Sequence, residues 1–240
     1  MLILRSIIFN LGMALSTIVM APLIPLMFIL PYGVRYPYLR QWSRFNIWWL
    51  RIACGLDYQV KGRENIPEGP AVVLAKHQSA WETLALQQIL PPQTWVLKKE
   101  LLWIPLFGWG LAATRPIAID RKAGKRAIKQ VVEQGKERLA AGIWLVIFPE
   151  GTRVLPGARG RYAKGGAILA EKSGYPVLPV AHNAGEYWPK NGFIKRPGTI
   201  TLSIGPVIES KDKRAEEIIG ATEAWIEGEM AEIAPRGPAD

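Results

Sequence analysis

The chain has 240 residues, 49% of them hydrophobic and 21% charged, and 30 Lys and Arg against 20 Asp and Glu give it a formal net charge of +10. This length can bury a full core, the apolar fraction excludes a disordered chain, and a single cysteine excludes a disulfide framework or a multi-cysteine metal site. Nucleic-acid binders are basic but seldom so apolar, whereas proteins that sit on anionic membranes are often both.

The first feature along the chain is an uncharged, largely apolar run between Arg5 and Arg35. About 20 mostly apolar residues suffice for a membrane-spanning helix, so a single span is one interpretation. A monotopic or re-entrant pair of helices is another, because Pro22, Pro25 and Pro31 interrupt the run and proline kinks a helix. A cleaved signal peptide fits less well, since its apolar core would be only about 7–15 residues long.

A helical segment is predicted over 38–52, and its side chains divide into two faces at about 100° per residue. Arg40, Arg44 and Arg51 fall on one face, and the opposite face carries Tyr38, Trp42, Phe45, Trp49 and Ile52. Such a helix suits the headgroup boundary of a membrane, where Trp, Tyr and Arg are favoured. It equally suits a helix whose aromatic face packs on the core of the protein while its arginines are solvated.

From about residue 57, short β-rich runs alternate with helical stretches. We therefore predict N-terminal membrane-anchoring helices in residues 1–56 and a second domain in residues 57–240. Strands are predicted at 57–61, 71–75, 94–97, 116–119, 143–148, 177–181 and 200–204, and helices at 80–90, 122–141, 165–173 and 213–230. This alternation indicates an α/β fold with a mainly parallel sheet flanked by helices. The tail from Pro235 to Asp240 is expected to fray.

Residues that could carry chemistry first gather at 76–82, where an apolar run ends and a helix begins. In open α/β sheets this edge is where ligands bind. His77 could act there as a general base, with the Glu82 carboxylate holding its ring and stabilising the imidazolium. The segment is also a capping box, in which Ser79 caps the helix and Glu82 reaches back to the Ser79 amide. From the spacing alone both interpretations remain open.

A second group follows another apolar strand at 148–153, with the sequence Phe-Pro-Glu-Gly-Thr-Arg. Gly151 allows close backbone approach, Thr152 can donate from its hydroxyl, and Arg153 offers a planar fork to phosphate. Arg121 stands at the end of a further strand, which in a parallel sheet would place it on the same edge. The alternatives are a solvated loop and a weak surface ion pair.

Three further features carry weaker signals. Lys164 precedes a glycine pair that enters a helix, which is a phosphate-friendly arrangement. His182, at the end of a strand, is interpreted as a structural histidine rather than a second base. The run 108–113 fits a loose dinucleotide fingerprint but lacks a clear strand before it and a suitable acidic residue after it. Because no zinc-finger, RNA-recognition or basic-zipper signature is present, we expect no nucleic-acid partner.

Taken in order, these motifs resemble the glycerolipid acyltransferase family, in particular its 1-acylglycerol-3-phosphate (lysophosphatidate) acyltransferases. That family shows a His-x4-Asp/Glu motif, a segment ending in arginine, the sequence Phe-Pro-Glu-Gly-Thr-Arg, and a Val-Pro-containing strand. The matching stretches here are 77–82, 117–121, 148–153 and 177–180, and all four in this order are highly specific. The sequence departs from the residues commoner in the family at Lys76, Glu82, Arg115 and Ala118.

The resemblance implies a mechanism and a set of site residues. His77 would take the proton from the free hydroxyl of a lysophospholipid, whose oxygen attacks the thioester carbonyl of acyl-CoA or acyl carrier protein. Glu82 would orient His77 and stabilise its charged form. The substrate-binding residues, mainly for the acceptor's phosphate, would be Arg121, Glu150, Gly151, Thr152, Arg153 and Lys164. The resemblance implies no metal, and no cofactor besides the acyl thioester as co-substrate.

For the whole protein, the resemblance implies a membrane-bound enzyme that acylates the sn-2 hydroxyl of 1-acylglycerol 3-phosphate and gives phosphatidic acid. Its partners would be the phospholipid membrane, a lysophospholipid acceptor, and an acyl-CoA or acyl carrier protein donor. The excess of arginine after the apolar run would place the active site on the cytoplasmic face, at the inner membrane of a bacterium. The alternatives are acyl transfer to another lyso-lipid or to glycerol 3-phosphate, or a non-catalytic membrane lipid-binding protein.

Overall fold

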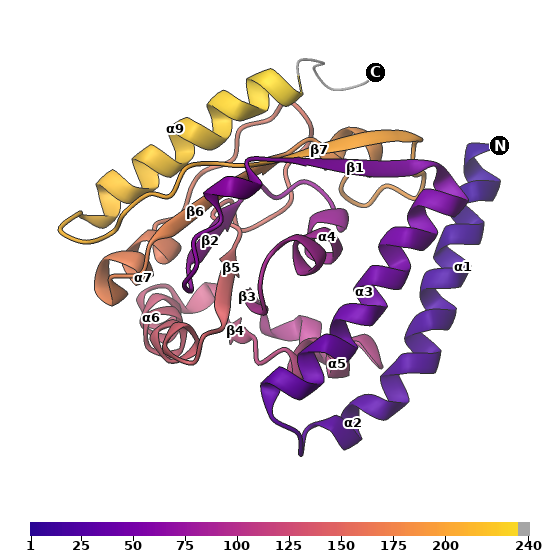
Figure 1. The fold of residues 1–240 in the computed structure, drawn as a ribbon, viewed down its shortest axis with the longest axis horizontal. Helices are drawn as coiled ribbons and strands as arrows, with labels where there is room; N and C mark the ends of the chain where they lie inside the picture. The colour runs from indigo at the N-terminus through magenta and orange to yellow at the C-terminus, as the bar shows by residue number, and fades with distance from the viewer. Residues whose placement is uncertain (235–240) are drawn as a thin grey trace.

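The computed structural model describes residues 1–234, so the tail from Pro235 to Asp240 lies outside the described residues. Its centre is a seven-stranded sheet in the order β1-β7-β6-β2-β5-β3-β4 (Figure 1), parallel throughout except between β6 and β7. The strands are β1 (Leu56–Lys61), β2 (Val72–Ala75), β3 (Gln93–Lys98), β4 (Ile117–Ile119), β5 (Trp144–Ile147), β6 (Val177–His182) and β7 (Gly198–Ile204). Each predicted strand is present within a few residues, which confirms the mainly parallel α/β fold.

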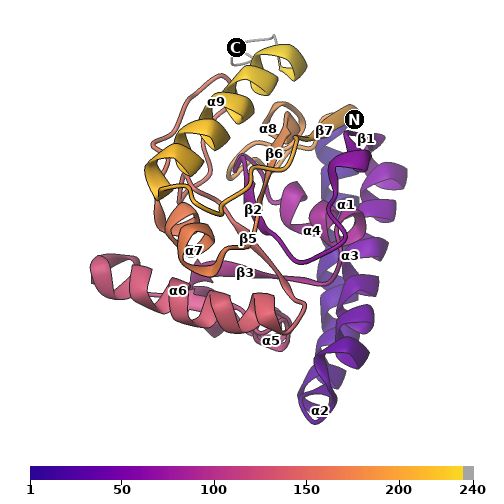
Figure 2. The same cartoon turned by 60° about the vertical axis from the view of Figure 1, so that its left-hand side comes forward.

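Helices cover both faces of the sheet, which is why the central strands β2, β5 and β6 are buried along their whole length. On one face lie α6 (Lys125–Ala140), α7 (Gly165–Ser173) and α9 (Ala215–Ile233), and on the other lies α4 (Trp81–Ile89) (Figure 2). Two separate clusters of buried apolar side chains fill the two layers between sheet and helices.

Three predicted helices differ in detail from the structure. The helix predicted at 38–52 is part of a longer one, Tyr32–Cys54. The helix predicted at 122–141 is interrupted by Gly124, whose φ of +52° favours glycine and separates a short helix η4 (Arg121–Ala123) from α6. The helix predicted at 213–230 begins two residues later and extends to Ile233. The short helices α5 (Phe107–Ala113) and α8 (Ala184–Tyr187) were not predicted. Each has too few turns for a helical periodicity to be visible in its sequence.

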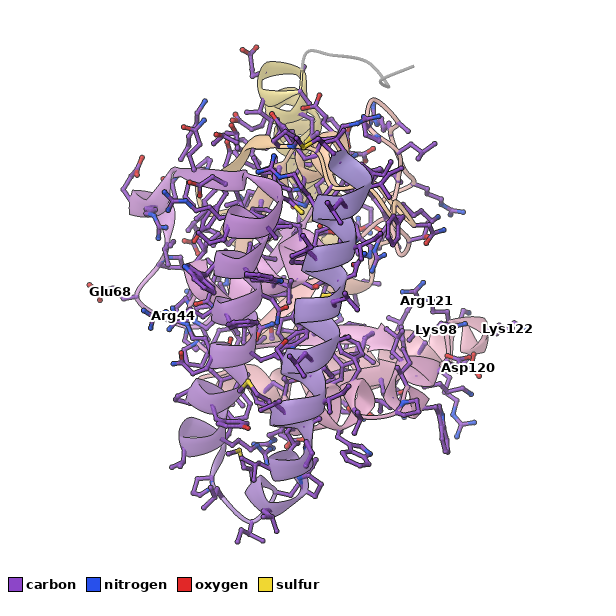
Figure 3. The ribbon with its side chains drawn as sticks, turned by 90° about the vertical axis from the view of Figure 1, so that its right-hand side faces the viewer. Arg44, Glu68, Lys98, Asp120, Arg121 and Lys122 are labelled. Atoms are coloured by element: carbon purple, nitrogen blue, oxygen red, sulfur yellow. The ribbon has the colours of Figure 1, made fainter. Side chains whose placement is uncertain are left out.

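The N-terminal segment is a hairpin of helices. It consists of α1 (Leu2–Met20), η1 (Ala21–Leu23), α2 (Ile24–Met27) and α3 (Tyr32–Cys54). The chain reverses direction before α3, and Figure 3 shows α1 and α3 side by side. Among the described residues one helical stretch, Leu2–Met27, is long and apolar enough to cross a membrane. The apolar run forms the stretch Leu2–Met27, and the helix that pairs with it carries the basic and aromatic segment, so the spanning and the re-entrant interpretations both stay predictions. The domain division at residue 56 also stays a prediction, since Phe9 and Leu50 of the hairpin join the main core.

The aromatic face of α3 packs only in part against the rest of the molecule. Trp49 lies against α1, where its Nε1 donates to the carbonyl of Ile8 at 3.3 Å, and Trp42 borders an internal cavity. Phe45 and Ile52 remain exposed. Packing on the protein, the second interpretation of this helix, therefore describes Trp42 and Trp49.

The sheet topology brings the predicted functional segments to one edge. Because β2 is parallel to β5, and β3 is parallel to both β5 and β4, these strands all end at the same carboxyl edge. The loops that follow β2 and β5, at 76–80 and 148–153, leave the sheet there, and so does Arg121 after β4. Ligands of parallel α/β folds bind at such an edge.

Candidate active site

His77 and Glu82 form a hydrogen-bonded pair between β2 and α4. His77 Nδ1 lies 2.7 Å from Glu82 Oε1. The Glu82 carboxylate, fully buried, also accepts from the backbone N–H groups of Gln78 and Ser79 at 3.0 to 3.2 Å. Ser79 Oγ in turn accepts from the N–H of Trp81 at 3.1 Å. The capping box is present only in part: Glu82 reaches back to the Ser79 amide, but the helix begins after Ala80 and the Ser79 hydroxyl accepts from Trp81 rather than from Glu82. The same carboxylate also holds the imidazole, as the pairing of His77 with Glu82 requires.

The surroundings of Glu82 keep it ionised. Burial by itself raises the pKa of this carboxyl, but the His182 and His77 imidazoles and backbone hydrogen bonding outweigh burial and lower the pKa of Glu82 below its ordinary value. An ionised carboxylate only accepts, so the His77 proton is assigned to Nδ1 and the lone pair to Nε2. The His77 ring also stacks on Phe148, with centroids 4.0 Å apart. His77 is thus held in the orientation and tautomer that suit a general base.

His182 lies fully buried behind this pair, in agreement with a structural role. Its Nε2 donates to the carbonyl of Lys76 at 2.9 Å, and its Nδ1 accepts from the N–H of Ala184 at 3.3 Å. Burial lowers the pKa of His182, so the ring is neutral near pH 7. Both ring nitrogens are engaged by the protein, which leaves neither for a substrate.

Glu150, assigned by the resemblance to the substrate-binding residues, points into the protein instead. Its side chain is completely buried, and its Oε2 accepts from the backbone N–H of His77 at 2.8 Å. Its Oε1 lies 2.8 Å from the Lys76 ammonium. Burial raises the pKa of Glu150, and the neighbouring Lys76 opposes that rise. The geometry corrects the expectation for Glu150: it holds the backbone of His77 and does not line the cavity.

Lys76 pairs with Glu150, a role that the sequence motifs did not predict. In the sequence Lys76 stood out only as a departure from the residues commoner in the family. It is 1% exposed, and besides Glu150 it pairs with Glu227 of α9 at 2.8 Å. Tyr162 donates to the same Glu227 oxygen at 2.7 Å. The sequence does offer one signal for this pairing, because Lys76 directly follows a run of apolar strand residues. A lysine at such a position is expected to be buried, and lysine is almost never fully buried unless it is paired.

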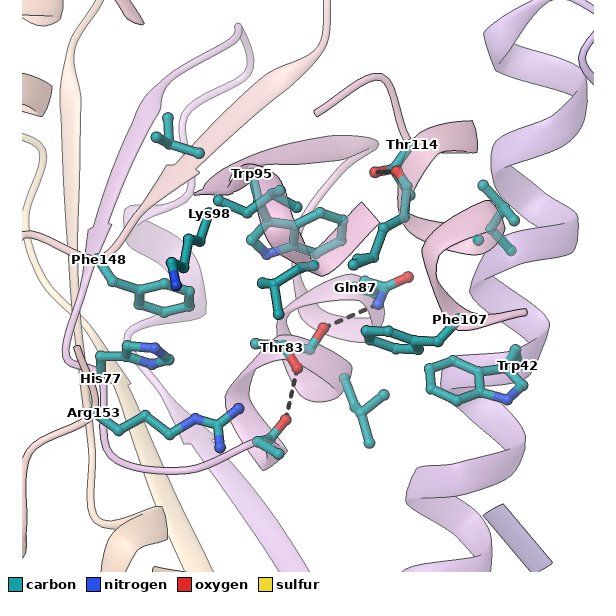
Figure 4. Close-up of a pocket in the computed structure, with 18 of the residues that line it drawn as sticks. Trp42, His77, Thr83, Gln87, Trp95, Lys98, Phe107, Thr114, Phe148 and Arg153 are labelled. Atoms are coloured by element: carbon teal, nitrogen blue, oxygen red, sulfur yellow. Dashed lines mark hydrogen bonds between the residues drawn. The ribbon is translucent and has the colours of Figure 1, made fainter. Parts of the chain in front are cut away.

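A largely apolar cavity of about 330 Å³ adjoins His77 and is lined from the sheet, α3, α4 and α5. Figure 4 shows His77 and Arg153 on one side of it, Trp42 and Phe107 on the other, and Trp95 between them. Such a space suits an apolar chain whose polar end reaches the imidazole.

Arg121 and Arg153 line this cavity together with His77, so the structure brings these predicted residues together. Gly151 adopts a φ of +68°, a left-handed turn conformation that glycine tolerates best. Thr152 is in the same loop, and its Oγ1 accepts from the Lys190 ammonium at 3.3 Å. This loop therefore presents backbone, hydroxyl and cationic groups at the carboxyl edge of the sheet.

The structure does not bring Lys164 to the other predicted residues. It stands at the start of α7, it does not line the cavity, and its Nζ pairs with Glu216 of α9 at 2.9 Å. This exposed ion pair links α7 to α9.

The fold and the site together define a mainly parallel α/β protein with a hydrogen-bonded His–Glu pair beside an apolar cavity. The family model described as Acyltransferase matches residues 57–183, more than half of the chain. The chain is 52% identical over 211 residues to the 1-acyl-sn-glycerol-3-phosphate acyltransferase of Pseudomonas aeruginosa, covering 86% of this chain and 82% of that protein. It is 30% identical over 197 residues to the Saccharomyces cerevisiae protein of the same name, covering 75% of this chain and 62% of that protein.

A solved structure shows the same fold. The crystal structure of the 1-acyl-sn-glycerophosphate acyltransferase PlsC from Thermotoga maritima matches with a TM-score of 0.81 at 23% identity, over 99% of this chain and 98% of that one. The chain belongs to the acyltransferase family, and it is an enzyme of acyl transfer. The resemblance inferred from the four motifs is confirmed.

Proposed function

We propose that this acyltransferase moves a fatty acyl group from an acyl thioester to the sn-2 hydroxyl of 1-acylglycerol 3-phosphate and forms phosphatidic acid. The observation that carries the proposal is the His77–Glu82 pair beside an apolar cavity that Arg121 and Arg153 also line. A lysophosphatidate offers a hydroxyl for the base, an acyl chain for the cavity and a phosphate for the arginines. The bacterial and yeast relatives are both named as 1-acyl-sn-glycerol-3-phosphate acyltransferases, which supports the same acceptor.

In the proposed mechanism His77 is the general base. Its Nε2 takes the proton from the sn-2 hydroxyl while that oxygen attacks the thioester carbonyl carbon, and Glu82 stabilises the imidazolium that forms. The tetrahedral intermediate then collapses: the new ester C–O bond remains, the C–S bond breaks, and the imidazolium gives its proton to the leaving thiolate. The acyl group passes directly to the acceptor, so no acyl-enzyme forms.

The phosphate of the acceptor is proposed to lie between Arg121, Arg153 and the 151–152 turn. Arginine binds phosphate with two parallel N–H donors, and the Thr152 hydroxyl can donate while it accepts from Lys190. Arg153 lines the same cavity as His77 (Figure 4), which supports a phosphate site on the side of the cavity where the proposed base lies. Lys164, paired with α9, has no part in this arrangement.

The enzyme is proposed to work at the cytoplasmic surface of a membrane, held by its N-terminal hairpin. Several α1 side chains are more than half exposed: Leu4, Leu11, Leu15, Ile18 and Val19. Together these side chains form an exposed apolar surface along α1, and a large exposed apolar surface marks a membrane or partner contact. The arginines that follow the apolar run favour the cytoplasmic face.

An acceptor panel tests the proposed reaction. Purified full-length protein in detergent is given acyl-CoA or acyl carrier protein donors of the same chain length. The acceptors are 1-acylglycerol 3-phosphate, a lysophosphatidylethanolamine and glycerol 3-phosphate. We expect phosphatidic acid from the first acceptor at a kcat/KM well above those for the other two. A higher kcat/KM with either of the others overturns the proposed acceptor.

A further inference from the structure

An exposed apolar patch lies where the cavity reaches the surface, and the proposed mechanism does not use it. The patch lies on η3 (Lys99–Trp103), on α5 and on the turn between them, and we call it the η3–α5 patch: Leu101, Trp103, Ile104, Phe107 and Trp109. Trp103 is 83% exposed. Leu101 and Phe107 are exposed and also line the cavity, so the cavity opens within the patch. Single exposed apolar residues are ordinary, but a contiguous group marks a contact surface.

The η3–α5 patch is continuous with the N-terminal hairpin. α5 packs on η1 and α2, and a Cβ at Gly110 of α5 would lie 3.6 Å from Cδ1 of Ile24. Figures 1 and 2 both place α5 beside the α2 end of the hairpin. That end exposes further apolar side chains: Leu23, Leu26, Phe28, Ile29 and Leu30. The two segments, far apart in sequence, therefore share one apolar surface.

Exposed cations flank the patch in the sequence, at the start of η3 and from η4 into the first turn of α6, and we call them the basic border: Lys98, Lys99, Lys122, Lys125 and Arg126. The ion pair between Lys99 and Asp120, at 2.6 Å, joins η3 to η4 and so brings both halves of the border together. Figure 3 shows Lys98 and Lys122 projecting on the same side of the hairpin. Residues 98–129 carry eight Lys and Arg and two Asp and Glu, a net +6 of the chain's +10.

We propose that the η3–α5 patch and the basic border form a second contact with an anionic phospholipid bilayer, continuous with that of the hairpin. The inference rests on the proposed membrane location of the enzyme. Tryptophan is favoured at the headgroup level, and lysine and arginine are attracted by anionic lipids. An acidic soluble partner would match the cations, but it would leave the apolar surface shared with α2 uncovered. The consequence is that the cavity opens toward the bilayer, so an acyl chain enters it from the hydrocarbon without crossing water.

Depth-dependent fluorescence quenching tests the patch. In a full-length Cys54→Ser background, single cysteines carry an environment-sensitive fluorophore at Trp103→Cys or Trp109→Cys. Leu15→Cys on α1 reports the hairpin, and Ala231→Cys, exposed on α9, is the matched control. Each protein is reconstituted with vesicles of phosphatidylcholine and phosphatidylglycerol that contain a lipid-borne quencher. We expect the probes at 103, 109 and 15 to be quenched and that at 231 to stay unquenched.

Quenching at 15 without quenching at 103 and 109 overturns this inference and leaves the hairpin anchor standing. An unquenched probe at 15 overturns the proposed membrane location and the inference with it. The acceptor panel in detergent does not depend on either result, so failure of the acyl-transfer proposal is recognised separately.

Charge reversal tests the basic border. The triple variant Lys122→Glu, Lys125→Glu, Arg126→Glu should bind phosphatidylglycerol-containing vesicles at least tenfold more weakly, since each basic residue near such a surface contributes roughly fivefold. The control triple Lys172→Glu, Lys211→Glu, Lys213→Glu changes the net charge equally on exposed lysines away from the patch, and it should bind nearly as the wild type does. Equal weakening by both triples overturns the assignment. So does an unchanged vesicle affinity with a raised KM for the acyl donor in detergent, which would make the border a donor-docking site.

Discussion

At the scale of single residues, His77 is held by contacts that do not involve substrate. Its Nδ1 faces Glu82, its backbone N–H donates to Glu150, and its ring stacks on Phe148. A base held in this way needs little reorganisation at the moment of reaction, which is what general-base catalysis requires.

Replacing the base should remove most of the activity. We expect His77→Ala to lower kcat by a factor of about 10² or more, because the acceptor hydroxyl then loses its proton acceptor. Initial rates of phosphatidic acid formation measure the effect, and thermal unfolding of the same samples reports on folding. Near-normal turnover by a folded variant would remove His77 from the mechanism.

Replacing an arginine of the phosphate site should act on acceptor binding. We expect Arg153→Ala to raise the KM for 1-acylglycerol 3-phosphate by roughly tenfold to a hundredfold, since a hydrogen bond to a charged group contributes about 1.5–3 kcal/mol. Arg63→Ala, an exposed arginine that does not line the cavity, is the control. The prediction is contradicted if the two variants share the wild-type KM and kcat.

The buried imidazole of His182 should make stability depend on pH. Its pKa is lowered in the fold from an ordinary 6.5, so below pH 6.5 the unfolded chain binds a proton that the native chain does not. Stability is therefore expected to fall with acidification, by up to about 1.4 kcal/mol per pH unit. Glu82, whose pKa is also lowered, adds a loss of stability of the same sign, but only below its ordinary value of 4.5.

His182→Gln tests this assignment, because its amide can still donate to the Lys76 carbonyl but does not titrate. We expect the variant to show a flatter dependence of unfolding free energy on pH between about 5 and 7. Denaturant unfolding at several pH values measures the slope, and a slope equal to that of the wild type would assign the titration to another group.

At the scale of elements, the hairpin depends on close packing of α1 against α3. Gly12 lies against the indole of Trp49, so a Cβ at this position collides with the ring. The contact holds Trp49, one residue of the aromatic face of α3, against α1. The amphipathic pattern of 38–52 showed two faces but could not show which neighbour would cover the aromatic one.

A pair of identical substitutions tests this packing. Gly12→Ala is expected to destabilise the protein by about 1–3 kcal/mol, because the added methyl group overpacks the contact. Gly33→Ala in α3 has open space around its Cβ and should stabilise by about 0.5–1 kcal/mol, since alanine favours a helix. Thermal unfolding in one detergent compares them, and shifts of the same sign would refute the packing argument.

At the scale of the whole molecule, a buried ion cluster joins the active-site loop to the last helix. The Lys76 ammonium lies 2.8 Å from carboxylate oxygens of both Glu150 and Glu227, and Glu150 holds His77. The cluster therefore couples the position of the base to the docking of α9 on the sheet.

Removing the cation should cost much of the stability. We expect Lys76→Met to destabilise by about 3–5 kcal/mol, because two carboxylates lose their buried partner. Lys99→Met breaks an exposed pair with Asp120 and should change stability far less, because solvent screens an exposed ion pair. Adding Glu227→Gln to Lys76→Met should recover part of the loss. Chemical unfolding of the three variants measures this, and equal effects of the two lysine changes would contradict it.

The sequence by itself determined the features that depend on local spacing. Strand and helix alternation predicted the sheet, and four residues between His77 and Glu82 brought base and carboxylate together, because a helix start keeps such a spacing in one turn. The carboxyl ends of parallel strands share an edge, so Arg121 and Arg153 were also predictable as neighbours of the site. Their chemical roles remain proposals.

Only the tertiary structure decided the contacts that join distant segments. Lys76 pairs with Glu227, Lys164 pairs with Glu216, and the η3–α5 patch adjoins α2. The hydrophobic periodicity of the sequence shows only whether one face of an element is apolar or polar. It does not record which surface lies opposite, because burial and pairing depend on how the layers pack. For the same reason, only the structure showed that Glu150, which belongs to a motif suited to phosphate binding, faces the protein interior. It also showed where the apolar excess of the composition is exposed, namely on the N-terminal hairpin and on the η3–α5 patch.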